Sequence, residues 1–260
     1  MKAMNIVKKA FTWSVVLTTI LWSVGAAALA PLAVSAVETC PTLSAGDLYL
    51  VDGNTAVFYV TEGMKARYFP NGQVFEAWYG VGAGSYDGTI YTLTAACAGA
   101  YPQESSQAGI NFPPGSLVQQ PVGAGVYYVG FDNQVSLLGS ADDARALFGD
   151  DWAMRIAGRI HTYHWANYNS DGATALSADV YPEGLLVRVD DVVYYIMADG
   201  LAHVMGGELG YLAGTVVDGS ADMLPTVSEE AVSADTVTAD PSQGVATVVD
   251  APEGEDETEF

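Results

Sequence analysis

The feature that most constrains this chain is a residue pattern that recurs at a fixed interval. Similar segments begin at Gly46, Gly115 and Gly184, which are 69 residues apart in each case. Each segment continues with a leucine two positions later, a short loop, an aromatic pair and a turn signal. A supersecondary unit repeated in this way buries too little apolar surface alone, so we expect the copies to pack on one another. The aromatic pairs are Phe58-Tyr59, Tyr127-Tyr128 and Tyr194-Tyr195.

The pattern inside each copy predicts three short strands followed by a short helix. Runs such as "VVYYI" combine β-branched and aromatic residues, which suit a pleated surface. Turn signals follow the aromatic pairs, as at Asp132-Asn133 and Asp199-Gly200. In the second copy Ser140 and Asp143 form a helix-start signature before Ala144. The expected fold class is therefore β-rich α+β, with tandem repeats of three antiparallel strands and one helix.

The composition changes sharply after the third copy. The segment from Asp218 to Phe260 contains no Lys or Arg and is rich in acidic, Ser, Thr, Ala and Pro residues. Such a sequence cannot bury enough apolar area to offset its chain entropy, which predicts a disordered acidic tail. The expected boundaries are a leader at 1–36, repeats at 37–112 and 113–181, a partial third repeat at 182–217, and the tail at 218–260.

The first 36 residues have the character of an export signal. Three lysines precede a long apolar run that ends in the small-residue sequence Val34-Ser35-Ala36. Cleavage after Ala36 would release an extracellular or cell-surface protein. The apolar stretch is also long enough to cross a bilayer, so an uncleaved anchor at residues 11–36, as in a membrane-anchored accessory protein, is the alternative.

The chain contains two cysteines, Cys40 and Cys97, and both follow the leader. An even count in an exported protein predicts one structural disulfide. The alternative is a pair of buried thiols. Neither cysteine has a CxxC partner or a neighbouring catalytic base.

The charge and the motifs exclude several functions. The net charge is −22, and −25 once the leader lysines are removed, which repels the phosphates of nucleic acids. No GxSxG, HExxH or phosphate-binding loop occurs in the sequence. His161 and His164 form an HxxH without a third nearby ligand. We therefore expect a non-enzymatic protein.

Calcium is the most reasonable ligand for so acidic a chain, because hard cations bind carboxylate and carbonyl oxygens. The best local candidate is "NYNSDG", with Asn167, Asn169 and Asp171 as ligands. The segment lacks the glutamate at position twelve of a complete EF-hand loop, where Ala178 stands. An ordinary turn is the competing interpretation.

The recurring aromatic residues are the candidate contact residues. Alternation along a strand sends one member of each pair into the core and the other outward, toward a neighbouring module or a ligand. Exposed aromatics can also stack on sugar rings, so carbohydrate binding is the rival function. The residues singled out as contacts are Tyr59, Tyr128, Tyr195, Trp78 and Trp152.

The first copy also resembles a known family. Its segment "GDLYLV…AVFYV…GMKARYFPNGQVFEAWYG" is similar to the pattern G-x-L-V-K…A-V-Y-Y…D-G-K-R-Y-x-F-P-N…F-x-S-W-Y of surface proteins from uncultured small-genome bacteria. The third copy departs from this pattern, because it lacks the basic residue and the Phe-Pro-Asn. The matching residues are Gly46, Leu48, Val57, Tyr59, Gly63, Lys65, Arg67, Tyr68, Phe69, Pro70, Asn71, Phe75, Trp78 and Tyr79.

The resemblance implies an S-layer-like surface protein and no known reaction. Together with the leader and the repeats, it predicts a structural protein that associates with itself and is bridged by calcium. Its partners would be further copies of the chain or cell-envelope glycan. The alternative is a carbohydrate-binding or adhesive surface module.

Overall fold

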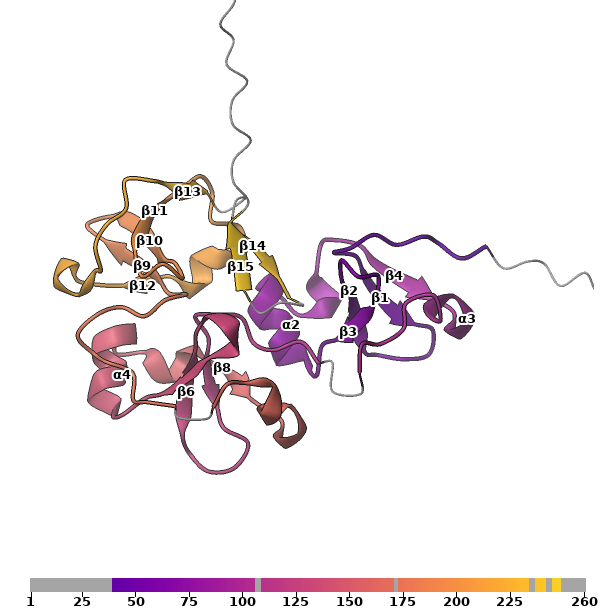
Figure 1. The fold of residues 1–260 in the computed structure, drawn as a ribbon, viewed down its shortest axis with the longest axis horizontal. Helices are drawn as coiled ribbons and strands as arrows, with labels where there is room; N and C mark the ends of the chain where they lie inside the picture. The colour runs from indigo at the N-terminus through magenta and orange to yellow at the C-terminus, as the bar shows by residue number, and fades with distance from the viewer. Residues whose placement is uncertain (1–38, 106–108, 171–172, 234–236, 242–244, 249–260) are drawn as a thin grey trace, which may run out of the picture. The chain divides into compact units, whose positions relative to one another are not determined.

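The computed structural model describes residues 39–105, 109–170, 173–233, 237–241 and 245–248 (Figure 1). The predicted leader and residues 249–260 lie outside these ranges. The chain divides into Met1–Cys40 and Pro41–Phe260, and every element described below belongs to the second unit. That unit is built from three sheets of mixed strand direction, with short helices between them.

The first sheet contains three antiparallel strands and one parallel strand. Its strand order is β3-β2-β1-β4, and β4 runs parallel to β1 at the sheet edge. Helix α2 connects β3 to β4 by crossing from one edge of the sheet to the other. The elements are β1 (Leu48–Val51), β2 (Val57–Val60), β3 (Ala66–Tyr68), α2 (Gly72–Tyr79), η1 (Ala83–Ser85), β4 (Ile90–Leu93) and α3 (Ala95–Ala98).

The middle sheet follows the same order, β7-β6-β5-β8, and β8 is parallel to β5. Helix α4 begins at the predicted cap, where the Ser140 hydroxyl accepts a hydrogen bond from the Asp143 amide at 3.1 Å. The elements are β5 (Leu117–Gln119), β6 (Val126–Val129), η2 (Phe131–Asn133), β7 (Val135–Leu137), α4 (Ala141–Phe148), η3 (Trp152–Arg155), β8 (Ile156–Arg159) and η4 (Thr162–Asn167).

The last sheet has the order β12-β9-β10-β11-β13. Its helical segment η5 is a 3₁₀ helix, where a short helix was predicted. Asp190 and Asp191, both with positive φ, form the two-residue turn between β9 and β10. The elements are β9 (Leu186–Val189), β10 (Val192–Ile196), β11 (Ala202–Gly206), η5 (Gly210–Thr215), β12 (Val217–Asp218), η6 (Ala221–Met223) and β13 (Val232–Ser233).

The three sheets therefore share an antiparallel meander with a parallel strand beside its first strand. The meander was predicted, but strands β4, β8 and β12 were not. In each case the following segment also runs parallel to the outer strand of the meander, as in the bridges Tyr68↔Gly109, Leu137↔Ala175 and Ala202↔Val227. This segment pairs with the backbone groups of an edge that would otherwise stand open.

The predicted start of the disordered tail at residue 218 is wrong. Val217 and Val232 are 2% and 8% exposed, and β12 and β13 pair with β9 and β11. The last sheet thus extends to Ser233, and the third unit is not the partial repeat that was predicted. A two-stranded hairpin of β14 (Val237–Asp240) and β15 (Val245–Val248) follows it.

Helix α2 packs between the first and middle sheets. Phe75 and Trp78 of α2 share one core cluster with Leu48 of β1 and with Val118 and Val129 of the middle sheet. The helix therefore covers the inner face of one sheet and the facing side of the next. Burial of apolar area on both sides of the helix stabilises the pair of sheets jointly.

Helix α4 repeats this arrangement one sheet further along. Leu147 and Phe148 pack with Leu117 and Tyr128 of the middle sheet and with Val187 of the last sheet. The far side of the last sheet packs against η5, in a cluster that includes Leu186, Tyr195 and Leu212.

The outer face of the first sheet is covered by the N-terminal segment. Leu43 and Tyr101 are buried there, and the Leu43 amide donates a hydrogen bond to the Tyr101 hydroxyl at 2.7 Å. Cys97 of α3 belongs to the same cluster, and the predicted disulfide between Cys40 and Cys97 is present.

The glycine that begins each of the three similar segments adopts a backbone conformation that favours glycine. Gly46, Gly115 and Gly184 have φ values of +92°, +90° and +91°, which L-residues with a side chain rarely adopt. Their amides donate equivalent hydrogen bonds, to the carbonyls of Val60, Val129 and Ile196. A Cβ on Gly115 would also lie 2.5 Å from the Gly184 carbonyl oxygen, so the middle and last units touch at their two glycines.

We expect Gly115→Ala to destabilise the protein more than Gly46→Ala does. Both substitutions force an L-residue into positive φ, at about 1–2 kcal/mol. A Cβ on Gly46 meets nothing within 4 Å, whereas on Gly115 it meets backbone. Overpacking should add about 1–3 kcal/mol for Gly115→Ala. Urea unfolding midpoints measure both losses, and equal losses would show that the contact between the two glycines contributes nothing.

Candidate functional site

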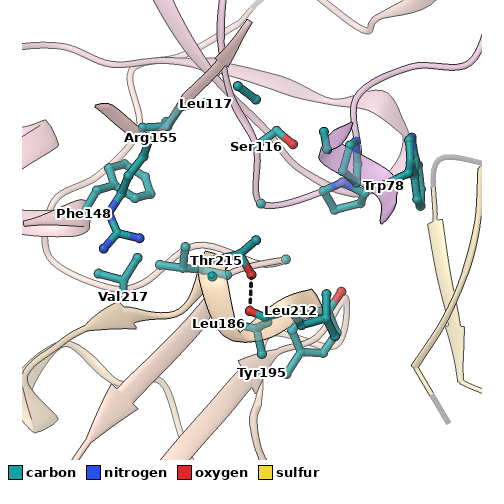
Figure 2. A pocket seen from close by; sticks show the side chains of 18 of the residues that line it. Trp78, Ser116, Leu117, Phe148, Arg155, Leu186, Tyr195, Leu212, Thr215 and Val217 are labelled. Atoms are coloured by element: carbon teal, nitrogen blue, oxygen red, sulfur yellow. Dashed lines mark hydrogen bonds between the residues drawn. The ribbon is translucent and has the colours of Figure 1, made fainter. Parts of the chain in front are cut away.

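A pocket of about 360 Å³ lies where the three sheet units meet (Figure 2). Its lining comes from the end of α2, the start of β5, the segment from α4 to β8, the start of β9, and η5. Pocket volumes of ~300–1,000 Å³ are usual for small ligands and for inserted side chains. The pocket is therefore the candidate functional site.

The side of the pocket on the right in Figure 2 is formed by Trp78. Trp78 is 2% exposed, and its indole N–H donates a hydrogen bond to the Asn111 carbonyl at 2.7 Å. The Asn111 side-chain amide in turn donates to Asn133 Oδ1 at 2.8 Å and to the Asn167 carbonyl at 3.2 Å. These bonds connect the tryptophan to residues of the middle unit.

Phe148 and Arg155 form the opposite side. The Arg155 guanidinium lies 3.3 Å from Asp151 Oδ1 and donates a hydrogen bond to the Val216 carbonyl at 3.2 Å. Arg155 and Asp151 are the two charged residues of the lining. Because they pair with each other, the pocket adds no net charge to the acidic surface.

Residues of the last unit close the pocket from below in Figure 2. Leu186 and Tyr195 are 5% and 7% exposed, and Leu212 of η5 lies beside them. The Thr215 hydroxyl donates a hydrogen bond to the Leu212 carbonyl at 2.8 Å. The hydroxyl proton of Thr215 is therefore used within η5. Met154 also lines the pocket and is 82% exposed, which places it at the mouth.

The chemistry of the lining suits an apolar guest. Side chains such as Trp78, Leu117, Phe148 and Leu186 give the walls their character. No histidine or cysteine contributes to the lining. The pocket can bury an aliphatic or aromatic group by exclusion of water.

The predicted outward orientation of Tyr59, Tyr128 and Tyr195 is wrong. They are 9%, 2% and 7% exposed, and each packs toward the helical layer that follows its own sheet. Their pair partners point the other way but also lie against a packed layer: Phe58 against the N-terminal segment, and Tyr127 and Tyr194 against the preceding helix. Both faces of each sheet are covered, so neither member of a pair is an exposed contact residue.

The two predicted tryptophans differ in their positions. Trp78 is buried but lines the pocket, whereas Trp152 is half-buried against the core cluster around α4. The pocket residues Arg155, Met154 and Leu212 were not predicted. The nearest sequence signal was the absence of Phe-Pro-Asn from the third copy. The 3₁₀ segment η5, which lines the pocket, lies in that part of the third copy.

The predicted calcium ligands brace a turn of the middle sheet. The Asn169 side-chain amide donates a hydrogen bond to the Asp132 carbonyl at 3.1 Å, and the Asn169 carbonyl accepts from Gln134 at 3.2 Å. The Asn167 carbonyl accepts from Asn111, and Asp171 lies outside the described residues. Within the described ranges, no group of three or more His, Cys, Asp or Glu is placed to hold a metal ion.

The histidines have structural partners. His164 Nε2 lies 3.1 Å from the Tyr68 hydroxyl, which joins the first and middle units, while its Nδ1 is buried without a hydrogen-bond partner. Burial lowers the pKa of His164, and His161 nearby lowers it further. His203 Nε2 lies 3.1 Å from Asp199. Burial raises the pKa of Asp199, but hydrogen bonds from the Leu201 amide and His203 outweigh this, and the net pKa lies below its usual value.

Comparisons with models of protein families, with curated proteins and with solved structures returned no match. Among the helices that the structure describes, none has the length and apolar character needed to cross a bilayer.

Stability should fall as the pH drops below the ordinary histidine pKa of about 6.5, because of His164. Its folded-state pKa is lowered, so the unfolded chain binds the proton first and the neutral ring favours the fold. The full contribution is present above pH ~6.5 and is lost as the pH falls toward the folded pKa, at up to ~1.4 kcal/mol per pH unit.

Urea unfolding between pH 5.5 and 7.5 measures this dependence. His164→Gln should flatten the profile in this window, whereas His161→Gln, at an exposed position, should leave most of it. A profile with the same slope in wild type and His164→Gln would show that His164 is not its source.

Proposed function

We propose that the chain is a non-enzymatic, exported, S-layer-like surface protein that associates with copies of itself. The observation that carries the proposal is the shared strand order of three sheets stacked through interposed helices. Such an arrangement is typical of one duplicated unit used as a scaffold. The resemblance of the first copy to bacterial surface proteins, and the predicted export signal, support the same function.

The core supports a mechanical role for this scaffold. Aromatic pairs in β2, β6 and β10 place large side chains on both faces of each sheet, and a disulfide anchors the N-terminal cover. Outside the pocket, the buried polar side chains Thr61 and His203 bond to groups four residues away, and His164 bonds to Tyr68 of the first unit. A buried, interlocked core of this kind resists unfolding better than separate small units would.

Calcium would act between copies in this proposal. Carboxylates on the surface of the middle unit are available for a shared site, since the side chains of Asp142 and Asp150 are 92% and 94% exposed. Both contact Arg145 and could exchange that partner for a divalent ion. A site completed by a second copy needs no cluster of ligands within one chain.

The carbohydrate-binding alternative receives less support from the geometry. Sugar stacking requires an exposed aromatic face, whereas Tyr59, Tyr128, Tyr195 and Trp78 are at most 9% exposed. Tyr163, at 46%, is the most exposed aromatic side chain among the large apolar groups of the described residues. A glycan array would nevertheless be the next experiment if self-association failed.

Sedimentation velocity of the predicted mature chain, residues 37–260, tests the proposal. We expect large particles to form as calcium is titrated in, because bridging ions offset the repulsion between acidic copies. EDTA should return them to small species if calcium lies at the contacts. A monomer at every protein and calcium concentration would overturn the proposal.

A further inference from the structure

The loop between β5 and β6 presents an apolar side chain to solvent. The loop reads "QPVGAG" over residues 120–125, and Val122 in it is 76% exposed. Val122 and Met154 are by a wide margin the two most exposed large apolar side chains of the described residues, because the next, Tyr163 and Val227, are 46% exposed. Burial of this side chain against another apolar surface would be favourable.

The loop is held in one shape by Arg159 of β8. Its guanidinium donates hydrogen bonds to the carbonyls of Gln120, Pro121 and Gly123 at 2.9, 3.4 and 3.2 Å. A fourth bond reaches Gln119 Oε1 at 2.9 Å. The Tyr127 hydroxyl holds Gln120 from the other side, donating to its Oε1 at 3.2 Å. A loop fixed in this way loses little conformational entropy on binding.

The fold itself does not require this loop. The equivalent connection in the last unit is the two-residue turn Asp190-Asp191, and in the first unit it is the polar segment 52–56, "DGNTA". Both turns join the same two strands without an exposed apolar tip. The longer loop and its arginine clamp are therefore additions to the middle unit, and their role lies outside the packing of the sheets.

A matching cavity exists elsewhere on the same chain. The pocket where the three sheet units meet, hereafter the junction pocket, has apolar walls, a neutral Arg155–Asp151 pair and Met154 at its mouth. Its volume of about 360 Å³ equals roughly twelve times the ~30 Å³ share of one water molecule, which leaves room for two small side chains. Val122 thus lies at the tip of a loop, and Met154 lies at the mouth of the pocket.

The distribution of charge allows a second copy to approach at the loop tip and at the pocket. Two chains of net charge −22 repel each other over most of their surfaces. The loop tip carries no acidic residue and lies over the Arg159 cation, and the pocket lining is neutral overall. These are places where acidic copies can approach without like-charge contact.

We propose that the Pro121-Val122 tip of one copy inserts into the junction pocket of the next copy, beside its Met154. The inference rests on the proposed self-association and names its contact. Leu117, at the start of β5, lines the pocket, whereas the loop leaves β5 at its opposite end. The tip and the pocket are therefore different surfaces, and a contact between them repeats from copy to copy as an open, head-to-tail array.

The test compares four forms of the exported chain by sedimentation over a range of concentrations, with and without calcium. They are the wild type, Val122→Asp, Met154→Asp and the control Val180→Asp, whose valine is 41% exposed on another segment. We expect Val122→Asp and Met154→Asp each to weaken association at least tenfold, and Val180→Asp to behave as wild type. Because all three side chains are exposed, unchanged urea midpoints should show that each variant is folded.

Mixing the two disabled variants gives a sharper result. Val122→Asp retains an intact pocket and Met154→Asp retains an intact tip, so their equimolar mixture should form dimers but no longer chains. If Val122→Asp assembled as strongly as the wild type, this contact would be overturned, but the proposed function would not. A wild type that remains monomeric throughout would overturn both, and equal weakening by Val180→Asp would assign the effect to charge alone.

Discussion

The structure depends on the fact that every sheet has two apolar faces, whereas each unit contributes one main covering segment, α2, α4 or η5. Along β6, Tyr127 points toward α2 and Tyr128 toward α4, and Tyr194 and Tyr195 divide in the same way in the last sheet. One short helix cannot cover both faces. Each inner helix is therefore shared by two sheets, and the first face is closed by the N-terminal segment with its disulfide. No unit is expected to be stable without its neighbour.

This sharing explains what could and could not be predicted from sequence. The turn signals, the strands of each meander and the Ser140 cap are local features, and the structure confirms them. Strand β12 has only two residues, and the pairing of both β8 and β12 is nonlocal, as in Asp218↔Arg188, so their own residues carry little signal. Alternation correctly separated the members of each aromatic pair, but it gave no information that both faces were covered. The composition of 218–233 concealed Val232, whose partner Met205 was set by the rest of the sheet.

The candidate site follows from the unequal helices. Helices α2 and α4 contribute Trp78 and Phe148 to the junction, but η5 is a six-residue 3₁₀ segment containing Gly210 and Gly214. A Cβ on Gly214 would meet nothing within 4 Å, so that part of the layer leaves space unfilled. A full amphipathic helix at this position would place larger side chains over Leu186 and Tyr195. The short η5 segment therefore covers less of the junction than a longer helix would, and the pocket lies beside it.

The distribution of charge explains why so few surfaces can serve as contacts. Beyond the leader, the cations are Lys65 and five arginines, and every arginine is engaged within the chain. Four bind carboxylates, at Glu104, Asp142, Asp151 and Asp218, and Arg159 binds the loop carbonyls. Lys65 is exposed, but one lysine and the paired arginines offer little positive charge to the acidic surface of another copy. Neutral apolar patches and bridging divalent ions are therefore the contacts that avoid repulsion between neighbouring copies.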